Sequence, residues 1–311
     1  MLGGKLVERL VREGSLGGVS ISALSLVDVV EVSRPEAPFA AGAIVADIAD
    51  REVVADLVAH RPDVVFHLAA VVSGEAEADM ATGYRVNLDG ARSLFDTIAG
   101  IDGYCPRLVF SSSIAVFGPP FPDSIGDDHP TAPQTSYGTQ KAIGELLLAD
   151  YSRRGLLDGV AIRLPTICVR PGRPNRAASG FFSSIIREPL HGEVAVLPVP
   201  DDTRHWFASP RSAVEFLLHA AALDGDLLGG RRCLTMPGVS ATVADEIEAL
   251  RAVAGDEAVE LIRREPDEAI ARIVSGWPHR FEPHRALDLG FHAEQSFDEI
   301  VRIYLEDELG S

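Results

Sequence analysis

Apolar runs bounded by turns alternate with stretches of helical period through the first half of the chain. This alternation is typical of a parallel sheet whose strands are joined by helices. The pattern predicts helices over residues 4–13, 50–60, 80–99, 136–153 and 209–222. It predicts strands over residues 21–28, 63–70, 107–112, 160–165 and 231–236. We therefore expect an α/β fold built on a doubly wound parallel sheet.

The alternation weakens after residue 165, and Pro and Gly are dense from 171 to 200. Residues 238–311 read as largely helical and acidic, and no repeat or detachable linker interrupts the chain. We expect the irregular parts to fold over the sheet as a smaller, mixed, mainly helical lobe. The predicted division is 1–165 plus 205–237 for the sheet domain and 166–204 plus 238–311 for the second lobe.

The start of the chain departs from the usual pattern of a doubly wound sheet. Such a sheet opens with a strand that feeds a glycine-rich turn into the first helix. This chain begins at the end of such a turn, with Met1-Leu2-Gly3-Gly4. A first strand would lie centrally, with hydrogen-bonded neighbours on both sides. We therefore expect that the first strand is missing from these residues.

Composition narrows the class of partner. Hydrophobic residues make up 46% and charged residues 24% of the 311 residues, a balance that favours a folded globular protein over a disordered one. With 28 Lys+Arg against 46 Asp+Glu, the net charge of −18 repels phosphate backbones and anionic lipid. We expect neither nucleic acid nor a membrane as a partner, and an anionic small substrate would need a local group of arginines.

The cysteines and the first residues bear on the cellular compartment. Cys105, Cys168 and Cys233 are spaced like neither a disulfide framework nor a zinc site. No apolar run approaches the roughly 20 residues that span a bilayer, and the first residues carry charges where a signal peptide is apolar. The sequence thus predicts a cytoplasmic protein.

The residues that carry chemistry lie on the predicted strand 107–112 and the predicted helix 136–153. Tyr137 and Lys141 are four residues apart, so their side chains share one helix face. An ammonium beside a phenol favours the phenolate, so we expect Lys141 to lower the pKa of Tyr137 toward that of a general base. Ser113 follows the strand at the carboxyl end, where such sheets bind ligands. Together they form a proton-handling set suited to carbinol–carbonyl chemistry.

These residues belong to a series of motifs along nearly the whole chain. The chain resembles an extended short-chain dehydrogenase/reductase of the NAD-dependent epimerase/dehydratase type, with a Rossmann-type sheet. The resemblance implies that Ser113, Tyr137 and Lys141 are catalytic. The motifs that carry it are Gly3 in the truncated turn, Asp28, Asp47-Ile48, His67-Leu68-Ala69-Ala70, Asn87, SSSIAVFG at 111–118 and SYGTQK at 136–141.

The same resemblance implies NAD as the cofactor. Asp28 supports this choice physically, because a carboxylate accepts the ribose hydroxyls of NAD and repels the additional phosphate of NADP. His67 lies between Phe66 and Leu68 and is expected to be a packed strand residue. The residues implied to bind the cofactor are Leu2, Gly3, Asp28, Asp47, Ile48, Leu68, Ala69, Ala70, Asn87, Tyr137, Lys141, Pro165 and Thr166.

A narrower resemblance concerns residues 163–175, 178–183 and 186–190. These runs are similar to the D-erythronate dehydrogenase branch of the family, which oxidises C2 of a four-carbon sugar acid. A guanidinium is a forked donor suited to a carboxylate. Of the arginines in this region, we expect Arg173 to hold the substrate carboxylate and Arg170 to be structural. The predicted substrate residues are Ser73, Ser113, Arg173, Asn175, Ser179 and Arg211.

Three functions compete. The first is NAD-dependent oxidation of the C2 hydroxyl of a small sugar acid to the 2-oxo acid. The second is a nucleotide-sugar epimerase or dehydratase with tightly retained NAD, and the third is an NAD-sensing regulator of the same fold. The intact Ser113, Tyr137 and Lys141 argue against the regulator. The family also suggests a homodimer through the helices near 80–99 and 136–153.

Overall fold

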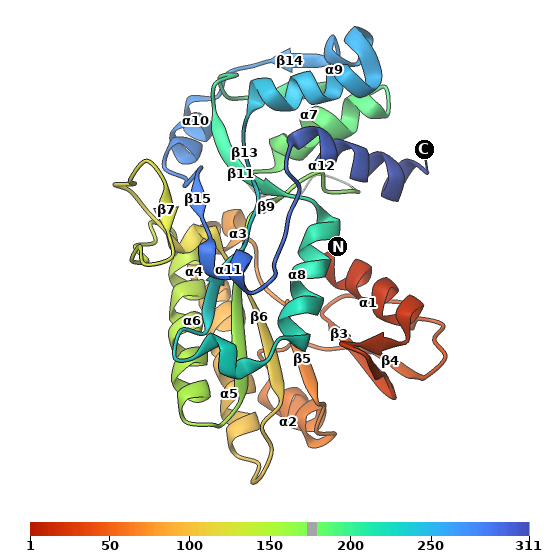
Figure 1. The fold of residues 1–311 in the computed structure, drawn as a ribbon, viewed down its shortest axis with the longest axis vertical. Helices are drawn as coiled ribbons and strands as arrows, with labels where there is room; N and C mark the ends of the chain where they lie inside the picture. The colour runs from red at the N-terminus through yellow and green to blue at the C-terminus, as the bar shows by residue number, and fades with distance from the viewer. Residues whose placement is uncertain (173–178, 311) are drawn as a thin grey trace.

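A computed structural model describes residues 1–172 and 179–310. Its centre is a parallel sheet with the strand order β12-β8-β6-β5 (Figure 1). The strands are Cys233–Thr235 (β12), Asp158–Leu164 (β8), Arg107–Ser113 (β6) and Val64–His67 (β5). The predicted α/β architecture is confirmed.

A second parallel pair lies beside this sheet. Strand β3 (Ala23–Asp28) pairs with β4 (Ala40–Val45) over its full length. Within the described residues, β3 is hydrogen-bonded to β4 alone and β5 to β6 alone. Strand β4 is absent from the sequence-based prediction, because its Ala-Ala-Gly start has weak strand propensity.

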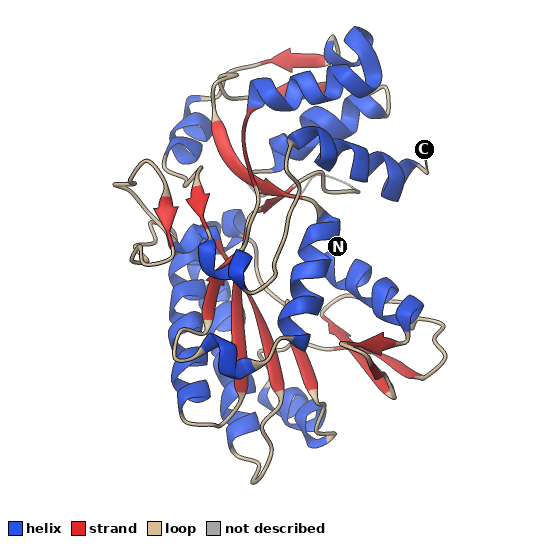
Figure 2. Ribbon diagram, viewed as in Figure 1, coloured by secondary structure: helices blue, strands red, loops and turns tan. Residues whose placement is uncertain are grey.

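Helices cover both faces of the four-stranded sheet (Figure 2). On one face lie α6 (Ser136–Arg153), α5 (Ala91–Ala99) and α2 (Arg51–Ala59). On the other lies α8 (Pro210–Ala222), with α1 (Leu2–Glu13) packed against it. Strands covered on both faces need apolar residues at successive positions, and this explains the continuous apolar runs of β6 and β8.

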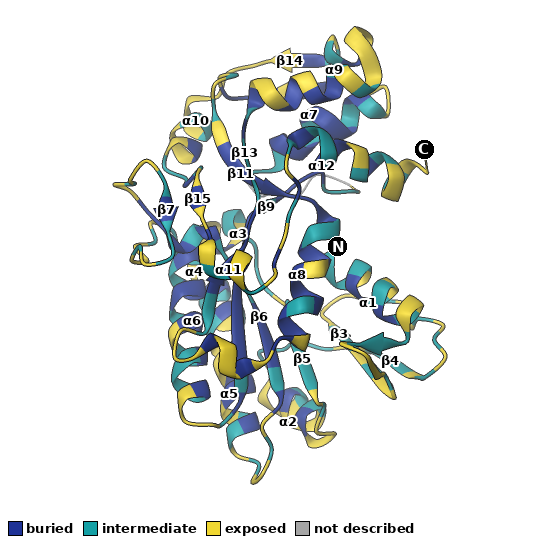
Figure 3. Ribbon diagram, viewed as in Figure 1, coloured by how far each residue is buried: buried dark blue, intermediate teal, exposed yellow. Residues whose placement is uncertain are grey.

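Strand β6 shows how the two faces divide. Phe110 packs with Phe95 of α5 and Leu148 of α6. Val109 points the other way and packs with Leu217 of α8. All these residues are fully buried. Most of β6 has the dark blue of buried residues in Figure 3. Strand β6 is therefore packed between two layers of helices.

The helix predicted over 80–99 is not uniform. It begins as α4 (Met80–Gly83), continues through a π-helical turn, η1 (Tyr84–Gly90), and ends as α5. A short helix, α3 (Ser73–Ala78), precedes it. Single π-helical turns within α-helices are frequent at functional sites.

The second lobe has a core of its own, with helices α7 (Gly180–Leu190), α9 (Val243–Val259) and α12 (Phe297–Tyr304) packed around it. Strand β11 (Arg204–Ala208) pairs with β13 (Val239–Thr242) and with β9 (Thr166–Ile167). The sequence placed most of β11 with the sheet domain, and the division of the chain into two domains stays a proposal.

The remaining elements are short or peripheral. They are β1 (Ser15–Leu16), β2 (Val19–Ser20), η2 (Ile114–Val116), β7 (Ile125–Gly126), β10 (Ala195–Leu197), η3 (Gly225–Leu228), β14 (Ile262–Arg264), α10 (Glu268–Ser275), β15 (Phe281–Glu282), α11 (His284–Asp288) and η4 (Leu305–Leu309). None of the helices described for residues 1–172 and 179–310 combines the length and apolar character that crossing a membrane requires.

Candidate active site

Ser113 is the last residue of β6 and caps the short helix η2 that follows. Its Oγ accepts a hydrogen bond from the backbone N–H of Ala115 at 3.1 Å. The cap turns the chain sharply and leaves the serine at the carboxyl edge of the sheet. This is the edge at which doubly wound sheets bind ligands.

Helix α6 starts close to this turn. Thr135 caps it by accepting from the N–H of Gly138 at 3.1 Å. A Cβ on Gly138 would stand 2.2 Å from the carbonyl oxygen of Ala115, so only glycine permits this approach. The approach brings Tyr137 close to Ser113, whose hydroxyl acts on the phenol and lowers its pKa.

Lys141 lies one turn further along α6 and is buried. Its Nζ donates to the carbonyl oxygen of Ser111 at 2.7 Å and lies 5.7 Å from the centre of the Tyr137 ring. An ammonium has three donors, and the described residues supply this one acceptor. The structure thus brings Ser113, Tyr137 and Lys141 together, with donors left for a ligand.

The expected lowering of the Tyr137 pKa is not observed in the protein alone. Burial raises the pKa of Tyr137 to about 12, and the hydrogen bond with Ser113 offsets this only partly. Lys141 directs its proton to the Ser111 carbonyl rather than to the phenol, and this explains the difference. Burial also lowers the pKa of Lys141 to about 8. General-base chemistry at Tyr137 therefore requires a further positive charge near the phenol.

Asn87 lies in the π-helical turn η1 and is 1% exposed. Its Oδ1 accepts from Val71 N at 2.7 Å, and its Nδ2 donates to Val71 O and to Gln140 Oε1. The whole amide is thus engaged by the protein. Asn87 supports the loop after β5 and the start of α6, and the direct cofactor contact implied by the resemblance stays a prediction.

His67 is buried against Phe110, with ring centres 5.6 Å apart. Burial lowers the pKa of His67 to about 3, so the imidazole is neutral. The expectation of a packed strand residue is confirmed.

Asp28 and Asp47 lie beside the carboxyl ends of β3 and β4. The exposed carboxylate of Asp28 accepts from Val30 N at 3.2 Å, which leaves most of its acceptor capacity free. Asp47 accepts from Ala49 N at 2.9 Å and from Arg85 Nη1 at 2.6 Å, and these bonds hold its pKa below the usual range. Asp28 is free for a ribose, whereas Asp47 is already tied to η1.

The other predicted cofactor residues lie along the same edge. Leu2 and Gly3 form the first turn of α1, whose unpaired N–H groups suit a diphosphate. The free acceptors of Asp28 and the unused donors of Lys141 suit the two riboses. These residues fit NAD. The remaining ones are Ile48 before α2, Leu68, Ala69 and Ala70 after β5, and Pro165 and Thr166 after β8.

The predicted substrate residues are distributed more widely. Ser73 begins α3, just after the loop held by Asn87. Arg211 binds Glu306 at 2.8 Å and Asp307 at 2.5 Å, so its charge is already balanced by the end of the chain. This pairing argues against a substrate contact, and the assignment of Arg211 stays a prediction. Arg173 and Asn175 lie outside the described residues.

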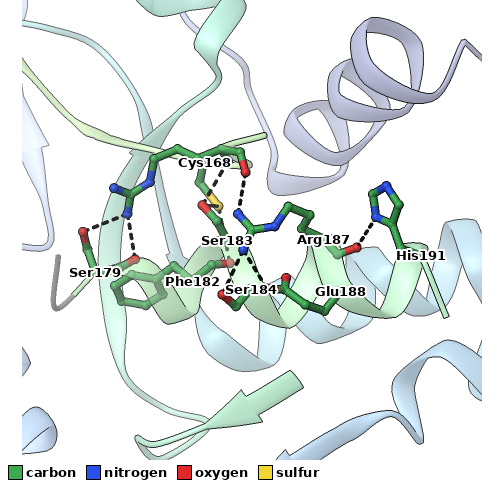
Figure 4. A network of polar contacts seen from close by, with 9 residues as sticks. Cys168, Ser179, Phe182, Ser183, Ser184, Arg187, Glu188 and His191 are labelled. Carbon is green, nitrogen blue, oxygen red and sulfur yellow. Dashed lines mark hydrogen bonds and ion pairs between the residues drawn. The ribbon is translucent and has the colours of Figure 1, made fainter. Parts of the chain in front are cut away.

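A polar network joins the loop after β9 to helix α7 (Figure 4). Arg170 Nη2 donates to the carbonyl oxygen and the Oγ of Ser179, each at 3.0 Å. Arg187 Nη1 donates to the Arg170 carbonyl at 2.7 Å, and its Nη2 pairs with Glu188 at 2.6 Å. These bonds support the expected structural role of Arg170. The predicted substrate contact of Ser179 stays a prediction, since Arg170 occupies part of its hydrogen-bonding capacity.

Sequence reasoning missed an ion pair beside the site. Glu145 and Arg163 are joined by two hydrogen bonds, one turn of helix beyond Lys141. The signal was present in the repeat of Tyr137, Lys141 and Glu145 at intervals of four residues, which places all three on one helix face.

Comparison with known proteins agrees with this geometry. The NAD dependent epimerase/dehydratase family matches residues 1–222. A D-erythronate dehydrogenase of Cupriavidus necator is 47% identical over 310 residues, which cover 98% of this chain and 95% of that protein. A D-erythronate dehydrogenase of Haemophilus influenzae is 40% identical over 305 residues, which cover 98% of this chain and 96% of that protein.

A solved structure extends the comparison to the fold. A nucleoside-diphosphate-sugar epimerase from Agrobacterium tumefaciens is 60% identical, with a TM-score of 0.94. The match covers 99% of this chain and 92% of that one. The Rossmann-type fold expected from the sequence is thereby confirmed.

Proposed function

Because this chain belongs to the NAD dependent epimerase/dehydratase family, we propose that it is an NAD-dependent dehydrogenase of a small sugar acid. The substrate is a D-erythronate-like acid, whose C2 hydroxyl is oxidised to the 2-oxo acid. The observation that carries the proposal is the contact of Ser113, Tyr137 and Lys141 at the carboxyl edge of the sheet. Two relatives of nearly equal length, named D-erythronate dehydrogenase, support the substrate class.

Each residue of the set has one task in this chemistry. Ser113 holds the substrate hydroxyl in line with Tyr137. Tyr137 accepts the hydroxyl proton once its pKa, raised by burial, is brought down. Lys141 holds a ribose hydroxyl with its unused donors and favours the phenolate by its charge. Bound NAD supplies the hydride acceptor and a positive ring near the phenol.

The epimerase alternative has its own support. The similar structure from Agrobacterium tumefaciens carries the name of a nucleoside-diphosphate-sugar epimerase. An epimerase would use the same serine, tyrosine and lysine, and would return the hydride to its substrate. The two functions therefore differ in whether reduced cofactor accumulates.

A substrate screen decides between them. The protein is incubated with NAD and a panel of four- to six-carbon sugar acids, and the absorbance of reduced nicotinamide is followed. We expect accumulation of NADH with D-erythronate or a close analogue and none with nucleotide-sugars. Interconversion of a nucleotide-sugar without net NADH, together with no oxidation of any sugar acid, would favour the epimerase.

The proposed setting is the reducing cytoplasm, with a homodimer as the working form. All three cysteines are free, and a reducing compartment preserves free thiols. Leu146 of α6 is 72% exposed, and the burial of this apolar side chain in a dimer interface is what supports the proposed dimer. A sedimentation measurement tests the dimer.

A further inference from the structure

A buried ion pair joins helix α6 to strand β8 next to Lys141. Glu145 is 3% exposed. Its Oε2 accepts from Arg163 Nη2 at 2.7 Å, and its Oε1 accepts from Arg163 Nε at 2.9 Å. Ser112 Oγ donates to the same Oε1 at 2.6 Å. One carboxylate therefore holds α6 against both β6 and β8.

The surroundings of Lys141 give this carboxylate a second effect. Burial of the ammonium lowers the pKa of Lys141, and the charge of Glu145 acts in the opposite direction. His67 contributes no charge, because it is neutral. Glu145 lies one turn along α6 from Lys141, on the same helix face, and among the described residues it is the anionic group whose charge acts on the ammonium. The groups around the ammonium are Tyr137 and Glu145 of α6, His67 of β5, and the Ser111 carbonyl and Phe110 ring of β6, and Arg163 of β8 is hydrogen-bonded to Glu145.

We infer that Glu145 and Arg163 are positioning residues for Lys141: Glu145 keeps its ammonium charged, and Arg163 limits how strongly Glu145 attracts it. With Glu145 occupied by two guanidinium hydrogen bonds, Lys141 stays directed at the Ser111 carbonyl and at a ligand. The inference rests on the proposed function, because it assumes that Lys141 holds the nicotinamide ribose. Neither Glu145 nor Arg163 is assigned a contact with substrate.

The two charges predict opposite effects when each is removed. Glu145→Gln removes the anion and leaves the Arg163 cation, so Lys141 should lose its proton at lower pH. Arg163→Gln leaves the full charge of Glu145 beside Lys141, which should then hold its proton to higher pH. An opposite charge at close range shifts a pKa by roughly 1–3 units, so we expect shifts of about one unit in opposite directions. A purely structural pair predicts equal losses of stability and no opposed shifts.

The readout is the affinity for NADH as a function of pH, measured by fluorescence titration. We expect affinity to fall on the alkaline side as Lys141 loses its proton. Lys141→Arg keeps its charge at every pH used, so loss of the alkaline fall in this variant assigns the midpoint to Lys141. The expected midpoints are below the wild-type value for Glu145→Gln and above it for Arg163→Gln.

A matched control lies at the other end of the same strand. Asp158 begins β8 and pairs with Arg107 at 3.0 Å and with Arg232 at 2.7 Å. Asp158→Asn should lower stability and leave the NADH midpoint unchanged. If the Glu145 and Arg163 variants shift the midpoint in the same direction, or leave it at the wild-type value, the inference is wrong.

Stability does not obscure this test. The midpoint is a property of the folded fraction, and NADH itself stabilises the folded state. Glu145→Asp weakens the pair but keeps the charge, so its midpoint should stay near that of wild type even as the melting temperature falls. If Glu145→Gln gives no folded protein, the absence of an upward shift in Arg163→Gln overturns the inference.

The proposed function can fail separately. NADH binding requires no sugar acid. If the two variants shift the NADH midpoint in opposite directions but no sugar acid is oxidised, the inference about Glu145 and Arg163 holds and the proposed dehydrogenase function is wrong. If a sugar acid is oxidised but the midpoints do not shift in opposite directions, the proposed function holds and the inference about Glu145 and Arg163 is wrong.

Discussion

Ser111, Ser112 and Ser113 have identical side chains and different partners. Their positions along β6 decide which element each one meets. Of the three, Ser113 stands where the strand ends, and its hydroxyl is the one that we propose to contact the substrate. The partners are the His67 carbonyl for Ser111 Oγ, Glu145 Oε1 for Ser112 Oγ, and the Ala115 N–H for Ser113 Oγ.

Replacing Tyr137 with Phe tests the proposed base. The ring should pack as before while the ionisable group is lost, so kcat should fall by roughly 10²–10⁴-fold. NAD affinity should change little. Tyr104→Phe is the control, because the Tyr104 hydroxyl donates to the Pro62 carbonyl on the surface of the sheet domain. Wild-type turnover in Tyr137→Phe would show that another group removes the proton.

Arg173 carries the prediction for substrate binding. If it holds the carboxylate of a sugar acid, Arg173→Ala should raise KM for that acid by roughly 10–100-fold, the loss expected for one charge-assisted contact. NAD affinity should be unchanged. Arg204→Ala, at an exposed arginine that bonds to the Ser240 carbonyl, should leave KM unaltered. An unchanged KM in Arg173→Ala would show that a different residue holds the substrate carboxylate.

At the scale of elements, helix α6 lies unusually close to the sheet. Gly138 meets the Ala115 carbonyl, and a Cβ on Gly144 would stand 2.7 Å from the ring of Phe110. Both glycines cost helix stability in isolation. Their effect is to let α6 bring Tyr137 and Lys141 to the edge of β6.

Gly144→Ala measures this closeness. Alanine favours a helix by about 1 kcal/mol over glycine, but overpacking typically costs about 1–3 kcal/mol, so we expect net destabilisation. Urea unfolding provides the measurement. Gly4→Ala is the control, because a Cβ there meets nothing within 4 Å in the first turn of α1. A more stable Gly144→Ala protein would show that the Phe110 ring moves aside without a loss of folding free energy.

The sequence predicted α6 over residues 136–153 with its observed bounds, because capping and apolar spacing are local signals. It missed β4 because the Ala-Ala-Gly start of this strand has weak strand propensity. It also missed α7, since the Pro and Gly density of 171–200 hid the helical spacing of Phe181, Phe182, Ile185 and Ile186. Local density of turn residues thus outweighed periodicity in the prediction.

For the site, the sequence predicted which side chains lie together but not what surrounds them. Spacing alone placed Tyr137 and Lys141 on one face, and the structure agrees. The predicted lowering of the Tyr137 pKa was wrong for the protein alone, because burial of the phenol raises its pKa and residue spacing does not show what packs over the ring. The pair Glu145–Arg163 joins segments 18 residues apart, and periodicity does not specify which distant side chains meet.

At the scale of the whole molecule, the second lobe contains a buried carboxyl group without a hydrogen-bond partner among the described residues. Glu246 of α9 is fully buried, and within residues 1–172 and 179–310 neither of its carboxyl oxygens has a hydrogen-bond partner. Desolvation raises the pKa of Glu246 well above 4.5. The folded state therefore binds more protons than the unfolded chain from pH 4.5 up to the raised pKa, and stability falls as pH rises through that range.

Glu246→Gln should remove this dependence. We expect the variant to be more stable than wild type at alkaline pH by about 1–3 kcal/mol, with a smaller difference near pH 4.5. Thermal unfolding at several pH values provides the measurement. Glu248→Gln, at an exposed position on the same helix, should leave the pH dependence intact. Parallel stability curves for Glu246→Gln and wild type would contradict the assignment.

The π-helical turn Tyr84–Gly90 also constrains how this protein can evolve. A π-turn holds one residue more than the α-helical turn it replaces. Deleting a residue there would restore the i→i+4 bonds of a regular helix, so the flanking halves would keep their orientation while the side chains within the shortened turn would point in new directions. The side chain of Asn87 would then lose its hydrogen bonds to Val71 and Gln140. Point substitutions can accumulate along this helix, but a single-codon deletion would separate the loop after β5 from the helix that carries Tyr137.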